Sequence, residues 1–182
     1  MGKWQRVSSE VVYTNPFYTV EKDVVIKPDG TQGGYSVVRK KPYVAVAAVH
    51  DDGRIYFIKQ FRYPTQREGY ELIMGGCDGE EPLVAAKREL REEAGLMAEH
   101  WEELGEIDTA SSFCDEIGYV FMATGLVPAS GHAQEEEGIT ECIPLGKAAY
   151  NDKIMRGEIR SAATIAVLYL AAQHVDKSGT VT

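Results

Sequence analysis

The sequence predicts an α+β fold, in which helices cover the faces of a mixed β-sheet and an antiparallel β-hairpin comes before them. Strand-like segments and turn residues fill the first third of the chain, whereas two later segments repeat apolar residues every three or four positions, as helices do. An unbroken apolar run at residues 43–50 is typical of a strand covered on both faces. Helices packed on the faces of a sheet provide such cover.

The N-terminal hairpin is indicated by two strand-like segments on either side of a turn. Residues 17–26 (FYTVEKDVVI) are rich in β-branched and aromatic side chains, and residues 35–40 (YSVVRK) continue this composition. Between them, residues 27–34 (KPDGTQGG) carry the proline, aspartate and glycines of a turn. Because a small hairpin is marginal in water by itself, we expect it to need a partner surface.

The central sheet is predicted from the segments that follow. The apolar run at residues 43–50 is separated by the turn Asp51–Asp52–Gly53 from a second strand at residues 55–63 (IYFIKQFRY), and we expect both in the central sheet. Later strand-like segments lie at residues 102–110, 118–126 and 139–145.

Two helices are predicted. The first begins at Pro82, which suits a first helical position, and ends at Gly95. The second covers residues 161–174 and has a broad apolar face. The apolar residues of the first helix recur at helical spacing: Leu83, Ala86, Leu90 and Ala94.

Composition restricts the class of protein. The chain has 182 residues, of which 44% are apolar and 26% charged, so it is expected to fold around a substantial core and not to be disordered or fibrous. The net charge of −9 disfavours binding to nucleic acid polymers and to anionic membranes. Small phosphorylated ligands stay compatible with it, because metal ions bridge carboxylates to phosphate oxygens.

Cysteine usage and the apolar segments bear on location. Cys77, Cys114 and Cys142 are widely spaced and form no CxxC pair, which suggests neither a disulfide framework nor a zinc site. The first residues lack the apolar core of a signal peptide, and the longest apolar stretch, residues 165–172, is too short to cross a bilayer. We therefore expect a cytoplasmic protein.

The first predicted helix carries three carboxylates on one face. Glu89, Glu92 and Glu93 stand at positions i, i+3 and i+4, within about a third of the helix circumference. One interpretation is a solvated acidic face. Like charges at i and i+4 destabilise a helix, however, and Arg88 paired with Glu92 offsets this only in part. A divalent cation such as Mg²⁺ offsets it better, because carboxylates at this spacing can bind it.

The segment around these carboxylates resembles the sequence box of the Nudix hydrolases. Residues 75–96 (GGCDGEEPLVAAKRELREEAGL) match every fixed position of the box from its first glutamate onward. At the front, the loop that starts with Gly75 and Gly76 is one residue shorter than the family pattern. The matching positions are Glu80, Arg88, Glu89, Leu90, Glu92, Glu93, Gly95 and Leu96.

The resemblance extends upstream to one branch of this family, the ADP-ribose and nucleotide-sugar pyrophosphatases. Gln60, Arg62 and Glu71 stand where that branch has its Gln-any-Arg strand end and the glutamate before the box, and the resemblance implies that they bind substrate. For Arg62, a surface ion pair with Glu68 or Glu71 is the competing interpretation. Residues 111–116 (SSFCDE) resemble the branch's loop after the box, although Ser112 replaces the usual proline.

The resemblance also implies an architecture and a domain organisation. The family fold is an α/β/α sandwich with a mixed sheet. Residues 1–40 are expected to form an N-terminal strand region that makes a homodimer, residues 41–175 the Nudix hydrolase domain, and residues 176–182 a flexible tail.

Roles for the box residues follow from the family. Glu89 and Glu93 are implied to be the principal ligands of Mg²⁺, for which Mn²⁺ can substitute, with Glu92 as a further catalytic ligand. The backbone carbonyl of Gly75 is a fourth expected donor, and Arg88 is expected to orient the glutamates by ion pairing.

A general base is expected from the acidic loop at residues 134–138 (QEEEG). Glu136 is our first choice, and Glu137 and Glu135 are the alternatives. A solvated loop tip is the competing interpretation of this charge run.

The sequence thus predicts an Mg²⁺-dependent hydrolase that cleaves the pyrophosphate bond of a nucleoside diphosphate linked to another group, with ADP-ribose or a related nucleotide sugar as substrate. The alternatives are hydrolysis of nucleoside triphosphates or dinucleoside polyphosphates, and a nucleotide-binding module without turnover.

Overall fold

The computed structural model describes residues 2–130, 134–135 and 138–178. The chain divides into two compact units. One consists of Met1–Pro42 with Asp108–Ile117, and the other of Tyr43–Ile107 with Gly118–Thr182. Each unit has its own sheet structure.

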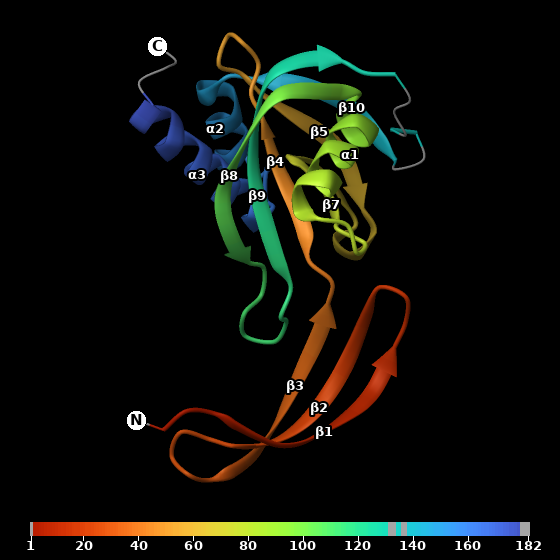
Figure 1. Ribbon diagram of the computed structural model, residues 1–182, viewed down its shortest axis with the longest axis vertical. Helices are drawn as coiled ribbons and strands as arrows, with labels where there is room; N and C mark the ends of the chain where they lie inside the picture. The colour runs from red at the N-terminus through yellow and green to blue at the C-terminus, as the bar shows by residue number, and fades with distance from the viewer. Residues whose placement is uncertain (1, 131–133, 136–137, 179–182) are drawn as a thin grey trace. The chain divides into compact units, whose positions relative to one another are not determined.

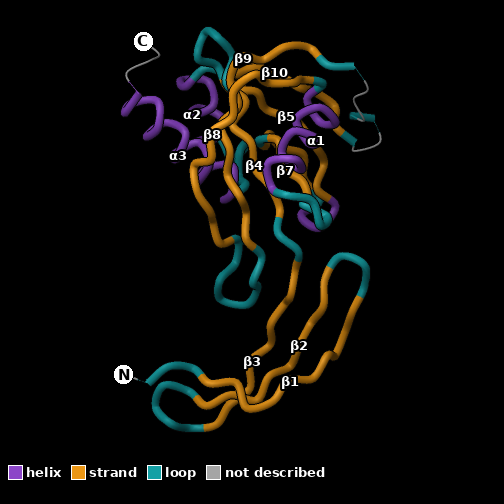
Figure 2. Tube along the Cα trace, in the orientation of Figure 1, coloured by secondary structure: helices purple, strands orange, loops and turns teal. Residues whose placement is uncertain are grey.

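The N-terminal unit is a three-stranded antiparallel sheet in the order β1-β2-β3 (Figure 2). Its strands are β1 (Gln5–Thr14), β2 (Tyr18–Ile26) and β3 (Gln32–Lys40). The predicted hairpin is confirmed as β2 and β3, and β1 is an additional strand. All ten residues of β1 are exposed, so no alternation of buried and polar residues marks it in the sequence.

The loop after the box belongs to this unit. The backbone of Val38 bonds to both ends of the loop turn, since its N–H donates to the Phe113 carbonyl at 2.7 Å and its carbonyl accepts from Asp115 N–H at 3.2 Å. The Tyr35 hydroxyl donates to the Ser112 carbonyl. The SSFCDE segment is therefore fastened to β3.

The second unit contains two sheets (Figure 1). A four-stranded sheet has the order β7-β4-β9-β8, in which β4 is antiparallel to β7 and parallel to β9. A three-stranded antiparallel sheet has the order β10-β5-β6. The strands are β4 (Tyr43–Ala48), β5 (Ile55–Arg62), β6 (Arg67–Glu71), β7 (Ile73–Gly76), β8 (Leu96–Asp108), β9 (Ile117–Pro128) and β10 (Ile139–Leu145), with a short 3₁₀ helix at Tyr63–Thr65.

Strand β4 explains how the layers are held together. Its side chains alternate, so that Val44 and Val46 join the core under helix α1 (Pro82–Ala94), while Ala45 and Ala47 join the core under α2 (Lys147–Met155) and α3 (Ala162–Ser178). All four are fully buried. Figure 1 shows α1 and α3 on opposite sides of this strand. The prediction that residues 43–50 are covered on both faces is confirmed, as is the mixed sheet with helices.

The structure differs from the sequence predictions in three details. The strands at residues 43–50 and 55–63 were expected in one sheet, but β4 and β5 lie in different sheets and share only the bridge between Val49 and Ile55. The edges of β4 are taken by β7 and β9. Strands β6 and β7 and helix α2 have no counterpart in the predicted elements, and α3 continues to Ser178, beyond the predicted helix end at residue 174.

No helix in the described ranges is both long and apolar enough to span a membrane.

Candidate active site

Helix α1 places the box glutamates. It begins after Glu81, with Pro82 in its first turn, and ends at Gly95, whose φ of 65° is left-handed and therefore suits glycine. Glu89 and Glu93 are buried, with exposed fractions of 9% and 3%, on a helix whose other buried residues are apolar. A solvated acidic face therefore does not describe these two carboxylates.

Arg88 joins this helix to the loop before it. Its Nη1 donates to Glu89 at 2.6 Å and to Glu92 at 3.0 Å, and its Nε donates to Glu80 at 2.9 Å. Its Nη2 donates to the carbonyl of Gly76 at 2.8 Å. One guanidinium thus orients three carboxylates and a backbone carbonyl, and the expectation that Arg88 pairs with the glutamates agrees with this geometry.

The electrostatics favour a permanent charge at Arg88. Burial alone lowers the pKa of its guanidinium, but the hydrogen bond to Glu80 and the charge of Glu89 outweigh burial, and the pKa lies above its ordinary value. Glu80 is a fixed box position to which the sequence analysis gave no role. The structure makes it a partner of Arg88 on the loop side.

The start of the box loop packs directly against the carboxylates. A Cβ atom at Gly75 would lie 2.0 Å from Cδ of Glu89, so only glycine leaves room for this side chain. One residue earlier, the backbone N–H of Met74 donates to Oε2 of Glu93 at 2.9 Å. The shorter loop therefore still brings strand β7 against both buried glutamates.

The donor set suits a hard divalent cation. Carboxylate and carbonyl oxygens are the ligands that Mg²⁺ prefers. Three carboxylates, those of Glu80, Glu89 and Glu92, share the single positive charge of Arg88, so negative charge is in excess. A second cation, Arg91, lies farther away, at 3.7 Å from Glu92. Within the described part of the chain, no three acidic, histidine or cysteine side chains already converge on a point that could hold a metal ion. The oxygen donors thus suit a divalent cation. In the structure, Arg88 and the backbone N–H of Met74 hold the carboxylates.

The three predicted substrate residues lie on β5 and β6. Arg62 makes a two-pronged ion pair with Glu71, with Nη2 at 2.7 Å and Nε at 3.2 Å from Oε2. Gln60 is 6% exposed and lies two residues before Arg62 on the same face of β5. The structure thus brings Arg62 and Glu71 together, as the alternative interpretation of Arg62 as an ion-pair partner of Glu68 or Glu71 predicts.

The acidic loop is anchored at the end of α1. The side chain of Gln134 donates to the backbone carbonyl of Glu93 at 2.8 Å. The sequence does not indicate this contact, because a single glutamine can bond to any of many backbone groups. Glu135, the third choice for the general base, follows directly and is exposed. Glu136 and Glu137, the first two choices, lie outside the described residues.

The thiols near the site are not activated. Burial raises the pKa of the Cys77 thiol in the box loop, and burial together with the charge of Glu93 raises the pKa of Cys142 to about 11. Both thiols are therefore neutral at physiological pH, and neither is activated as a nucleophile.

The packing of Gly75 gives a stability prediction. Gly75→Ala is expected to lower the free energy of unfolding by about 1–3 kcal/mol, because the new methyl group collides with the carboxylate of Glu89. Gly76→Ala is the matched control, since its Cβ would come no closer than 3.3 Å to the flexible side chain of Asp78. Urea unfolding measures both. Equal stability of the two variants would show that Glu89 does not occupy the space above Gly75.

Comparisons with known proteins agree with this geometry. The NUDIX domain family matches residues 39–162, and the family described as the nucleoside diphosphate sugar hydrolase N-terminal domain matches residues 4–38. An ADP-ribose pyrophosphatase of Mycobacterium tuberculosis is 36% identical over 90% of this chain and 80% of its own length. A methanol dehydrogenase activator of Bacillus methanolicus is 31% identical over 97% of this chain and 99% of its own.

A solved structure shows the same fold. The crystal structure of an ADP compounds hydrolase covers 100% of this chain and 98% of its own with a TM-score of 0.87 at 22% identity. Together with the box residues that Arg88 organises, the family match over residues 39–162 establishes that this chain belongs to the Nudix hydrolases.

Proposed function

We propose that this protein hydrolyses the pyrophosphate bond of ADP-ribose or a related nucleotide sugar. The observation that carries the proposal is the buried pair Glu89 and Glu93, which Arg88 and β7 hold in a box of the Nudix family. The N-terminal match to a nucleoside diphosphate sugar hydrolase domain and the Mycobacterium tuberculosis relative support the choice of substrate.

Nudix hydrolases generally use a divalent metal ion. For this chain we propose Mg²⁺, held by Glu89, Glu92 and Glu93 with the carbonyl of Gly75. When bound, such an ion neutralises pyrophosphate oxygens and makes a water molecule more acidic. The ion pairs of Arg88 hold Glu89 and Glu92 in fixed directions, which spares them the entropy of ordering when they bind a cation.

The remaining roles fall to side chains outside the box. A glutamate of the acidic loop, Glu136 first and Glu137 or Glu135 as alternatives, is proposed to take the proton of the attacking water. Gln134 supports this assignment because it fastens the loop to the backbone of Glu93. Arg62, held by Glu71, presents a guanidinium fork that can donate two hydrogen bonds to a phosphate or ribose, and the buried amide of Gln60 lies beside it.

Two alternatives compete with this proposal: hydrolysis of a different nucleotide, which gives different products, and nucleotide binding without turnover. Hydrolysis of a nucleoside triphosphate releases pyrophosphate or phosphate, whereas a nucleotide sugar gives a nucleoside monophosphate and a sugar phosphate. The Bacillus methanolicus relative is named for activating another enzyme, which is a role that binding alone could serve. The retention of all three box glutamates favours turnover, since buried carboxylates are costly to keep once no cation is needed.

The test is a product analysis by ion-exchange chromatography. The protein is incubated with Mg²⁺ and ADP-ribose, other nucleotide sugars, a dinucleoside polyphosphate or nucleoside triphosphates. We expect ADP-ribose to give AMP and ribose 5-phosphate. Consumption of the triphosphates alone would overturn the proposal.

Glu93→Gln tests the proposed metal ligand in the same assay. It removes one charge with almost no change in volume. Loss of an outer partner of a metal ligand typically costs about 10–100-fold, so loss of a direct ligand is expected to cost at least about 100-fold in turnover, with the melting temperature unchanged or higher. Turnover near that of the unaltered protein would contradict the role of Glu93.

We also propose a homodimer formed through the N-terminal strand region. Strand β1 exposes a run of large apolar side chains, with Val7 at 61%, Val11 at 57% and Val12 at 52% exposure. An exposed apolar patch of this kind marks a protein interface.

Light scattering tests the dimer. We expect about twice the chain mass for the unaltered protein, and a shift toward the monomer for Val11→Asp, which places a charge in the apolar patch. Val84→Asp is the control, because Val84 is 52% exposed but lies on α1 outside the N-terminal unit. A monomer at micromolar concentration of the unaltered protein would refute the dimer.

A further inference from the structure

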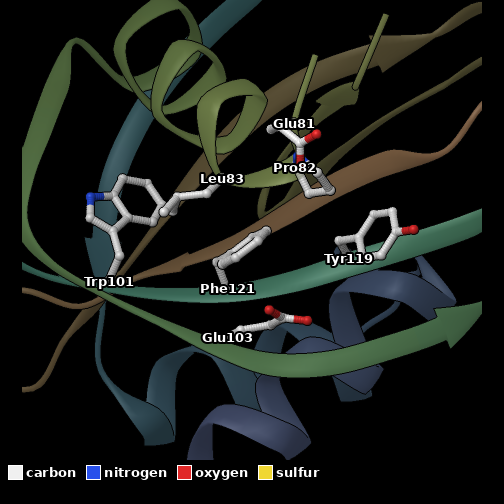
Figure 3. A pocket seen from close by; sticks show the side chains of 7 residues that line it. All are labelled: Glu81, Pro82, Leu83, Trp101, Glu103, Tyr119 and Phe121. Atoms are coloured by element: carbon white, nitrogen blue, oxygen red, sulfur yellow. The ribbon is translucent and has the colours of Figure 1, made fainter. Parts of the chain in front are cut away.

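A pocket opens at the first turn of α1 (Figure 3). It has a volume of about 440 Å³, within the range of small-molecule sites. Figure 3 shows Pro82 and Leu83 of α1 on one side, and three aromatic rings from the strands on the other. Its lining residues among those described are Glu81, Pro82, Leu83, Trp101, Glu103, Tyr119 and Phe121.

The aromatic wall is built by alternation along two neighbouring strands. Trp101 lies on β8, Tyr119 and Phe121 are two residues apart on β9, and all three point to the same face. Trp101 and Phe121 meet edge to face, with ring centres 6.4 Å apart and an interplanar angle of 74°. The indole N–H of Trp101 is engaged by the carbonyl of Ala98 at 3.3 Å, so the ring offers its π-surface and not a donor.

The charged groups of the pocket are both acidic. Glu81 precedes α1 but makes no capping hydrogen bond with its side chain, and Glu103 lies two residues beyond Trp101 on the same face of β8. Within the residues that the structure describes, neither carboxylate has an ion-pair partner, and no cationic side chain lines the pocket. Aromatic faces and carboxylates both attract positive charge.

We propose that this pocket binds a planar aromatic cation of the pyridinium type. A flat ring fits against the half-buried rings of Trp101 and Tyr119, and its positive charge is complementary to Glu81 and Glu103. A neutral ring lacks the second attraction, and an anion is repelled by both carboxylates. The pocket is separate from the proposed metal ligands Glu89, Glu92 and Glu93, since Leu83 and Glu89 are six residues apart on α1, about 9 Å along the helix axis.

The experiment uses tryptophan fluorescence. The chain has two tryptophans, so Trp4→Phe leaves Trp101 as the sole reporter. The probes are 1-methylnicotinamide, which carries a positive ring, and nicotinamide, which has the same ring and amide without the charge. We expect saturable quenching by the cation and only weak, linear quenching by the neutral probe. Binding is read without metal or substrate, so its outcome is independent of the proposed hydrolysis.

Charge removal completes the test. In the Trp4→Phe background, Glu81→Gln combined with Glu103→Gln is expected to weaken cation binding about fivefold or more. Both side chains are exposed, so the fold should tolerate the change. Glu106→Gln is the matched control and should leave binding unchanged, because Glu106 is an exposed carboxylate of β8 that does not line the pocket. The proposal would be overturned if both probes quenched only linearly, or if both bound saturably with equal affinity. It would also be overturned if the Glu81→Gln/Glu103→Gln protein and the Glu106→Gln protein bound the cation with equal affinity.

Discussion

The arrangement of the site depends on the guanidinium of Arg88. Its nitrogens donate to Glu80 and to the carbonyl of Gly76 on the loop side, and to Glu89 and Glu92 on the helix side. Without this fork, Glu80 and the carbonyl of Gly76 would lose their bonds to the helix, and adjacent glutamates would repel one another. A lysine cannot replace it, because an ammonium group lacks the planar geometry that reaches four acceptors in two segments.

The rest of the fold supports this contact by fixing where α1 lies. Strand β4 is buried on both faces, and its alternating side chains hold α1 against one core and α3 against the other. Strand β7 pairs with β4 and carries Met74 and Gly75 to the buried glutamates. A short apolar strand in the middle of the unit thus determines the geometry of a polar site at its edge.

The sequence predicted the fold class, both long helices and the grouping of Glu89, Glu92 and Glu93, because these depend on local periodicity. It did not predict that Glu89 and Glu93 are buried, since their cover comes from β7, which pairs with β4 across the sheet. Strand β1 escaped prediction because its exposed residues follow no alternating pattern. For Arg62, the sequence left a substrate contact and an ion pair with Glu68 or Glu71 as alternatives, and the pairing of β5 with β6 brings its guanidinium to Glu71. The cytoplasmic location, the general base and the domain limits stay predictions.

The central claim is that the carboxylates held by Arg88 form a binding site for a divalent cation. Electron paramagnetic resonance of Mn²⁺ tests it directly, because free and bound Mn²⁺ give different signals and no substrate is needed. The account predicts saturable Mn²⁺ binding that Mg²⁺ displaces, lost in Glu89→Gln and retained in Glu99→Gln, which removes the same charge from an exposed position on β8. No saturable binding, or equal binding in the two variants, would contradict it.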